Sequence, residues 1–357
     1  MFRPLVLFLA GFSVLGVGCM SALKTDDEVI ENLQTHEEYS ELVTIKQIEP
    51  EIKPVEKSEA KMSVQKEKEK SPTKEKQEKV KPDKKSPRKK GKSQIEVKPV
   101  IKSKAKVDKQ VRLPELEDSE GFVGRRPVVD PYEPGEVTEL ELSYLGMTAG
   151  TLVFETLPFV EVNGKKAYHF SIKMKSSDGF SMFYRINNDA ETFLDFDSLR
   201  PFSHEVHIKE SKQVKETRSF FDWDTLQGKY WEKKVTRKGE RKKHKQWDLV
   251  PYSQNLISGL FYIRTFTLTE GKTITFNVAD AGKQNLIKGT VVGKETISIP
   301  AGEFKTSVMK IQYEVDGTFK QIGDVFLYFT DDDNKRLVKV RAKIKIGSIV
   351  GEAIRVK

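Results

Sequence analysis

The feature that most constrains this chain is a break in composition, because no aromatic residue occurs between Tyr39 and Phe122. Beyond Phe122 the sequence is dense in phenylalanine, tyrosine, tryptophan, valine and isoleucine. Burial of apolar side chains must offset the conformational entropy that a chain loses on folding. We therefore predict three parts: a lipoprotein-type signal peptide over residues 1–18, a disordered charged linker over 19–125 and a folded domain over 126–357.

The N-terminus reads MFRPLVLFLAGFSVLGVGCMSA. Arg3 provides a positive start, and the apolar run from Leu5 to Leu15 is shorter than the about 20 residues that a membrane-spanning helix needs. With small residues leading to Cys19, this segment resembles a bacterial lipoprotein signal, in which the cysteine carries the lipid that anchors the mature chain. An ordinary secretory signal and a retained membrane helix are the alternatives.

Cysteine usage agrees with export. Cys19 is the only cysteine among 357 residues, which excludes an intramolecular disulfide and a cysteine nucleophile in the folded part. Met20 follows it and, by similarity to the sorting rules of enteric bacteria, favours the outer over the inner membrane. We expect a location in the bacterial cell envelope, at the outer membrane and facing the periplasm.

The charge of the linker is unevenly spread. Residues 21–60 hold 4 Lys/Arg and 11 Asp/Glu, whereas residues 61–110 hold 19 Lys/Arg and 7 Asp/Glu. Proline and like charges keep such a chain extended, and about 100 residues of flexible coil reach roughly 50–60 Å. The basic part, 61–110, is expected to contact peptidoglycan or another anionic envelope polymer, or to serve only as a spacer. Nucleic acid is the least expected partner.

From about residue 130 the hydrophobic pattern has a period of two, which is typical of half-buried strands. Residues 139–144, 167–174 and 338–346 show it, and short turn sequences separate such runs. We predict an all-β domain: an antiparallel, strongly curved or barrel-like sheet, with a β-sandwich as the alternative. One segment, 254–265, has helical spacing, with Leu256, Leu260 and Ile263 on one face, after a capping Ser253.

Several segments occur in an order that carries a resemblance: Tyr144–Gly150 (YLGMTAG), Leu260–Arg264 (LFYIR), Ile299–Thr306 (IPAGEFKT), Gly323–Asp332 (GDVFLYFTDD), Arg336–Val338 (RLV) and Ile346–Glu352 (IGSIVGE). Over roughly residues 134–357 they resemble a bacterial family of exported proteins, domain of unknown function 3108. The resemblance implies an all-β fold in an exported, often lipid-anchored protein. It brings no catalytic residues. Arg264 within its segment is expected either to pair with a carboxylate such as Asp324 or to be exposed.

The residues that could perform chemistry do not form a recognisable site. His204 and His207 are three apart, which puts them on opposite faces of a strand and makes them poor metal co-ligands. The run Asp331–Asn334 is followed by Lys335 and Arg336, where a calcium loop needs an oxygen ligand and a glycine. Nucleophile-elbow, zinc-helix and phosphate-loop motifs do not occur. We therefore expect no catalytic residues, no metal and no cofactor, and a non-enzyme in preference to an enzyme.

Two basic features are candidate contacts for an anionic ligand. Lys339, Arg341, Lys343 and Lys345 share one face of a predicted strand, although lysines on an edge strand also prevent aggregation. The second feature is a predicted hairpin tip over residues 233–245, with Arg241, Lys242 and Lys243. The aromatic residues just before it are interpreted as core and cross-strand pairs.

Together these features predict a non-catalytic envelope lipoprotein whose β-domain binds an envelope polymer, a lipid or a protein partner. The alternatives are an envelope hydrolase that acts on glycan or ester bonds, and a carrier of an apolar ligand inside a β-barrel.

Overall fold

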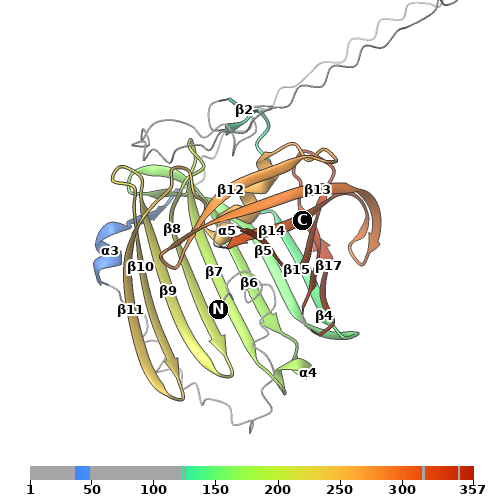
Figure 1. Ribbon diagram of the computed structural model, residues 1–357, viewed down its shortest axis with the longest axis horizontal. Helices are drawn as coiled ribbons and strands as arrows, with labels where there is room; N and C mark the ends of the chain where they lie inside the picture. Colours follow the sequence, from blue (N-terminus) through green and yellow to red (C-terminus); the bar gives the residue numbers. More distant parts are fainter. Residues whose placement is uncertain (1–36, 49–121, 124–125, 316–317, 345) are drawn as a thin grey trace, which may run out of the picture. The chain divides into compact units, whose positions relative to one another are not determined.

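A computed structural model describes residues 37–48, 122–123, 126–315, 318–344 and 346–357. Almost all of this part belongs to one antiparallel sheet of fifteen strands (Figure 1). The predicted all-β fold with a strongly curved antiparallel sheet is confirmed. Short turns join most consecutive strands, so neighbours in sequence are neighbours in the sheet.

The strands of the sheet follow one path, β11-β10-β9-β8-β7-β6-β5-β4-β17-β16-β15-β14-β13-β12. Their bounds are β4 (Val137–Tyr144), β5 (Met147–Val162), β6 (Lys165–Ser176), β7 (Ile186–Asp195), β8 (Pro201–Glu210), β9 (Gln213–Asp222), β10 (Gln227–Thr236), β11 (Gly239–Asp248), β12 (Thr273–Asp280), β13 (Lys283–Ile299), β14 (Gly302–Val315), β15 (Thr318–Thr330), β16 (Leu337–Lys343) and β17 (Ser348–Val356). Outside this path, β1 (Ile45–Gln47) pairs with β5, and β2 (Phe122–Val123) pairs with β3 (Arg126–Pro127).

The sheet is open, because its path ends at β11 on one side and at β12 on the other. It curls so that these two edges approach each other. The Nζ of Lys245 in β11 donates a hydrogen bond of 2.8 Å to the carbonyl oxygen of Ala281, just after β12. In Figure 1, β12 and β13 accordingly cross in front of the strands that precede β11. The contact between the edges is thus made by a side chain and not by a strand ladder.

The predicted helical segment forms α5 (Leu256–Tyr262) and the 3₁₀ turn η1 (Ile263–Thr265), and both fill the inside of the curl. The cap is Asn255 and not Ser253: the Asn255 side chain accepts from the backbone of Ile257 and Ser258. One side of α5 packs on β6, and the face with Leu256, Leu260 and Ile263 lines a small apolar pocket against β12–β15. The helix therefore joins the two halves of the curled sheet through one apolar core.

Residues 37–48 differ from their assignment to a disordered linker, because they form α3 (Glu37–Leu42) and β1. The reason is Tyr39, the last aromatic residue before the long gap. Its ring is 3% exposed and packs edge-on against Trp231, and its hydroxyl donates to Glu205 at 3.0 Å. Three register pairs with β5, the buried Val43 and hydrogen bonds from Lys229 and Trp231 to Glu38 add to this anchor. The rest of the predicted linker lies outside the described residues, as does the predicted signal peptide.

Within the described residues, none of the helices has the length and apolar character that a membrane-spanning helix needs.

Candidate anion-binding site

Three basic residues occupy one cross-strand row near the β11 edge of the sheet. Lys215 of β9 is the register partner of Lys234 in β10, and Lys234 is the partner of Arg241 in β11. Directly opposed residues point to the same face with their Cβ atoms about 5 Å apart, and like charges in such positions repel each other. Stability of the sheet therefore does not account for three cations in succession.

This row lies on the inner side of the sheet. A parallel row of register partners crosses β6–β11 through Phe170, Thr192, His204, Ser219, Tyr230 and Lys245. Phe170 stacks on Phe261 of α5, and Asn255 donates a hydrogen bond to Thr192, so the row faces the helix inside the curl. Along their strands, the three cations are each four residues from a member of this parallel row. Side chains of a strand alternate between its two faces, so the cations point to the same face as the row. We call Lys215, Lys234, Arg241, Lys243 and Lys245 the inner basic face.

Glu232 is the carboxylate in the middle of the inner basic face. It accepts a hydrogen bond of 2.8 Å from the Tyr230 hydroxyl and one of 2.7 Å from the Arg241 guanidinium. Burial raises the pKa of Glu232, but these two hydrogen bonds outweigh burial and the pKa is lowered, so the group is charged. Burial, followed by repulsion from Lys215, lowers the pKa of Lys234. Glu210, on the same face of β8, and Asp280, at the end of β12, also attract these cations, and the five cations outnumber the three carboxylates.

The turn between β12 and β13 covers the part of the inner basic face that includes Lys245. Besides the bond from Lys245 to Ala281, the Asp280 carboxylate lies 4.0 Å from Nε2 of His204. Burial raises the pKa of Asp280, and burial lowers the pKa of His204 to about 4, so the imidazole is neutral near pH 7.

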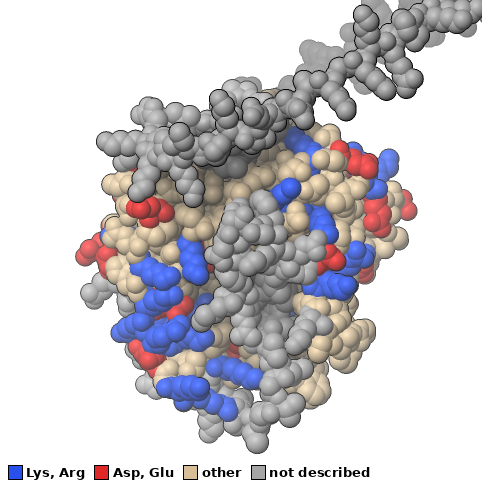
Figure 2. Space-filling model, viewed as in Figure 1, with Lys and Arg blue, Asp and Glu red and all other residues tan. Residues whose placement is uncertain are grey.

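Buried polar atoms near this turn lack hydrogen-bond partners. They are Nδ1 of His204, Oγ of Ser219 and Nε1 of Trp247, and none of the three has a partner among the described residues. Buried polar groups are rarely left unpaired, because an unmade hydrogen bond costs about 1–3 kcal/mol. Cations, unpaired donors and a covering turn therefore meet on one side of the sheet. Figure 2 shows lysine and arginine side chains gathered over the part of the molecule that β9–β11 form.

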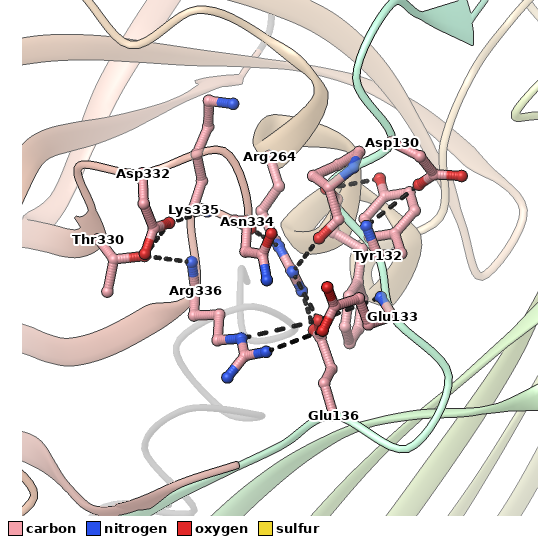
Figure 3. Close-up of polar contacts among 12 residues, drawn as sticks. Asp130, Tyr132, Glu133, Glu136, Arg264, Thr330, Asp332, Asn334, Lys335 and Arg336 are labelled. Carbon is pink, nitrogen blue, oxygen red and sulfur yellow. Dashed lines mark hydrogen bonds and ion pairs between the residues drawn. The ribbon is translucent and has the colours of Figure 1, made fainter. Parts of the chain in front are cut away.

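A second polar cluster holds the structure together. The Arg264 guanidinium in η1 pairs with Glu136 and donates to the carbonyl oxygens of Pro131 and Asn334 (Figure 3). Arg264 and Glu136 are both buried. The prediction that Arg264 pairs with a carboxylate is thus confirmed, but the suggested partner is wrong. Asp324 instead pairs with Lys310 at 3.0 Å. This cluster ties the segment before β4 to η1 and to the loop after β15.

The predicted tip residues are divided between the two faces of β11. Arg241 and Lys243 belong to the inner basic face, whereas Lys242 points to the opposite side, where its Nζ is 3.7 Å from Glu240. The predicted hairpin is confirmed, with its turn just before Gly239. The upstream aromatic residues are core residues, as interpreted: Phe221, Tyr230 and Trp231 are buried.

The second predicted cationic stripe has partners within the sheet. Lys339 pairs with Glu352 at 2.8 Å, and the Arg341 guanidinium lies 4.8 Å from the centre of the Phe326 ring. The suggestion of an edge strand is wrong, because β16 lies between β15 and β17. Lys343 is exposed at the end of β16, whereas Lys345 and Cys19 lie outside the described residues. A role for this stripe in ligand contact stays a prediction.

His204 and His207 lie on opposite faces of β8, as predicted, although His204 is buried. His204 faces inward, and His207 faces outward with Nδ1 2.7 Å from Asp189. The side chain of Asp331 pairs with Lys294, and Asp332 accepts from Thr330 and from the backbone of Lys335. Among the described residues, groups of three or more histidine, cysteine or acidic side chains placed to hold a metal do not occur.

Lys234 lies within the predicted tip over residues 233–245 but was not singled out there, and Lys215 was missed. Neither stands out from the many lysines of the chain. Aligning the period-two patterns of β9, β10 and β11 across their turns would have put them in one row with Arg241.

Fold and site together define a mainly β-sheet domain that curls around the helix α5 and carries a basic inner face. The sequence profile of the family described as protein of unknown function (DUF3108) matches residues 139–354, and the chain belongs to this family. The resemblance seen in the sequence is thereby confirmed. A search of curated proteins gave no significant match.

Solved structures with some similarity come from three bacteria. A β-barrel-like protein of the domain of unknown function DUF1849 from Brucella abortus has 11% identity and a TM-score of 0.40, over 63% of this chain and 97% of that one. A protein from Bacteroides fragilis described as exported, with a YmcC-like fold, has 9% identity and a TM-score of 0.28, over 64% and 98%. One from Parabacteroides distasonis described as a lipoprotein has 10% identity and a TM-score of 0.29, over 63% and 96%.

Proposed function

We propose that this chain is an exported, non-catalytic protein of the bacterial envelope that binds an anionic group on its inner basic face. The observation that carries the proposal is the cross-strand row Lys215, Lys234 and Arg241. Three opposed cations cost stability, and an anion that sits among them removes this cost. The unpaired polar atoms of His204 and Ser219 lie on the same face, but about 13 Å further along the strands, since four residues separate Ser219 from Lys215.

The chemistry of the ligand is that of a phosphate or a carboxylate. Both are available in an envelope, as headgroups of anionic lipids and as groups on peptidoglycan and related polymers. The N-terminal part of the proposal is that Cys19 carries the lipid anchor, at the outer membrane and facing the periplasm, and that residues 61–110 give a polymer a second contact.

The test compares two double variants of the full chain that lose the same charge. Lys215→Gln/Lys234→Gln removes two cations from the inner basic face. Lys209→Gln/Lys233→Gln removes two from the opposite side of β8 and β10. Each protein is mixed with purified sacculi in one arm and, in the other, with vesicles that contain phosphatidylglycerol, over a series of salt concentrations. The arm that responds identifies the source of the anion.

We expect the inner variant to lose about a hundredfold in affinity in one of the two arms, since it removes two charge-assisted hydrogen bonds that contribute roughly 1.5 kcal/mol or more each. The outer variant should bind as the unchanged chain does. Equal binding of both variants in both arms would refute a role for the inner face. An equal loss in both variants would show that binding depends only on net charge, which would also refute a role for the inner face.

A further inference from the structure

A second surface lies at one end of the sheet, where five exposed apolar side chains gather. They are Leu145 and Met147 at the β4–β5 turn, Met182 and Phe183 just after α4 (Asp178–Ser181), and Ile346 at the β16–β17 turn. Their exposed fractions lie between 57% and 72%. Together with Val128, they are the most exposed large apolar side chains in the part of the chain that the structure describes. We call these five residues the apolar rim.

Hydrogen bonds show that the three connections are neighbours. The Tyr144 hydroxyl donates to the carbonyl oxygen of Ile346 at 3.1 Å, which joins the β4–β5 and β16–β17 turns. The backbone of Ser177, which caps α4, donates to Ala149 at 2.9 Å, and its hydroxyl donates to Thr148. In Figure 1 the ends of β4 and β17 and helix α4 accordingly lie together at the lower edge of the sheet. The apolar rim is thus one surface and not a set of scattered residues.

The backbone conformation of Leu145 indicates that this leucine serves a role other than stabilising the fold. Its φ is 50°, in the left-handed region that leucine rarely adopts, and Gly146 beside it has a φ of 78°. A turn of this type accepts asparagine or glycine at such a position more easily than leucine. The Leu145 side chain packs against the glycine turn at Gly347 and is 61% exposed, so backbone preference does not account for it and packing does so only in part.

Cations flank the apolar rim along the same end of the sheet. A hydrogen bond connects the segment after α4 to the β8–β9 turn, and strand register places the β10–β11 turn at the same end of the sheet. Exposed basic residues near these turns are Lys175, Arg185, Lys212, Arg237, Lys238 and Lys343. Two exposed acidic residues, Asp178 and Glu240, lie at this end as well. Turns at the opposite end carry the exposed acidic residues Asp224, Asp331, Asp332 and Asp333 next to two exposed lysines, Lys165 and Lys166, so the balance of charge there is acidic. The two ends therefore differ in both hydropathy and charge.

We infer that the apolar rim docks on the surface of a lipid bilayer that contains anionic lipids. Apolar tips enter the boundary between headgroups and acyl chains, and the neighbouring cations attract the anionic headgroups. The acidic opposite end then points away from the membrane. This surface is separate from the inner basic face and does not depend on a ligand there.

The test measures depth, because an anchored chain reaches vesicles whether or not the rim touches them. Phe183→Trp places a fluorophore in the apolar rim, and Thr225→Trp places one at the opposite end, at two exposed positions. The full chain of each variant is bound to vesicles of phosphatidylcholine and phosphatidylglycerol in which a fraction of the lipid is brominated near the headgroup. The three native tryptophans give the background, which the unchanged chain measures. Circular dichroism confirms that both variants are folded.

We expect quenching at position 183 to exceed quenching at position 225 by about twofold or more, since only a fluorophore within the interface contacts the bromine. Salt at about 0.5 M should weaken this difference, because it screens the flanking cations. Equal quenching at the two positions, or stronger quenching at 225, would overturn the inference. So would quenching at 183 that is as strong in pure phosphatidylcholine, because the anionic lipid would then have no part.

Discussion

Arg264 and Glu136 form a two-fold hydrogen-bonded ion pair inside the protein, with both side chains about 5% exposed. Arg264 belongs to η1, at the end of the helix inside the curl, and Glu136 immediately precedes β4. A further bond of 2.8 Å from Nε of Arg264 to the carbonyl oxygen of Asn334 adds the loop after β15. One guanidinium thus connects three segments that are far apart in sequence.

Removing one member of this pair should destabilise the domain strongly. Arg264→Met leaves the buried Glu136 carboxylate with only the Arg336 guanidinium, whose Nε is 3.9 Å away, and we expect a loss of about 3–5 kcal/mol in the free energy of unfolding. The double variant Arg264→Met/Glu136→Leu should be less destabilised than Arg264→Met, because no buried charge remains. Urea unfolding of the three proteins checks this order. If the double variant were the least stable, the pair would act through packing and not through charge.

The strands were predictable from sequence because a half-buried strand repeats its environment every second residue, as in β4 and β16. The partner of Arg264 was not predictable, because Glu136 and Asp324 are equally acidic in sequence and only the path of the chain separates them. The order of residues 37–48 was also hidden, since it depends on contacts with distant strands, chiefly those of Tyr39, the one aromatic side chain in a charged segment.

Gly150 should tolerate no side chain. A Cβ atom at this position would lie 2.1 Å from the carbonyl oxygen of Lys175 in the neighbouring strand, so the backbone of β5 or β6 would have to move. We expect Gly150→Ala to lower the free energy of unfolding by about 1–3 kcal/mol. Gly293→Ala is the control, because a Cβ atom there meets nothing within 4 Å. Thermal unfolding of both variants measures the difference, and equal melting temperatures would contradict the prediction.

His204 should make the domain sensitive to acid. Burial lowers its pKa from 6.5 to about 4, so the unfolded chain binds more protons than the folded one between these values. The stabilising effect of the neutral imidazole is complete above pH 6.5 and is lost as the pH falls towards 4. It corresponds to about 3 kcal/mol, at 1.36 kcal/mol for each pKa unit.

This pH dependence can be assigned to His204 by comparing variants. We expect the free energy of unfolding of His204→Leu to fall less between pH 7 and about 4.5 than that of the unchanged chain. His244→Gln, at an exposed histidine of β11, should keep the full dependence. Denaturant titrations at several pH values give these slopes. Identical slopes in all three proteins would assign the acid sensitivity to carboxyl groups elsewhere.

Tyr39 should control whether residues 37–48 stay on the sheet. Tyr39→Ala removes a buried ring and its contacts with Trp231, a change that costs about 3 kcal/mol or more. We expect faster tryptic cleavage after Lys46 and faster amide exchange in β1, with the rest of the sheet unchanged. Tyr39→Phe keeps the ring and loses only the bond to Glu205, so it should behave nearly as the unchanged chain does. Equal cleavage rates in all three proteins would show that the ring does not hold the segment.

Of the candidate site, sequence identified the two cations next to the hairpin turn, Arg241 and Lys243, because a cluster of charges is visible along one strand. The rest of the inner basic face is formed across strands. Lys215 and Lys234 are separated by a whole hairpin, and their proximity depends on the register of β9 with β10. A register shift of one residue would put Lys234 on the other side of the sheet.

The cations of the inner basic face should therefore lower the stability of the fold and strengthen anion binding. Lys234 stands between Lys215 and Arg241, and burial together with repulsion by Lys215 lowers its pKa. Lys234→Gln relieves both effects, and we expect it to raise the free energy of unfolding by about 0.5–1 kcal/mol while it weakens anion binding. Lys233→Gln, one residue away on the other face, is the control and should change neither quantity by as much.

Urea unfolding with and without added inorganic pyrophosphate measures both the stability and the anion binding of these variants. The anion should stabilise the unchanged chain and the Lys233→Gln variant more than Lys234→Gln, because a ligand that binds the folded state raises its stability by an amount that grows with the logarithm of its affinity. If Lys234→Gln proved less stable than the unchanged chain, the row of cations would be a structural element, and the argument for a ligand from its strain would fail.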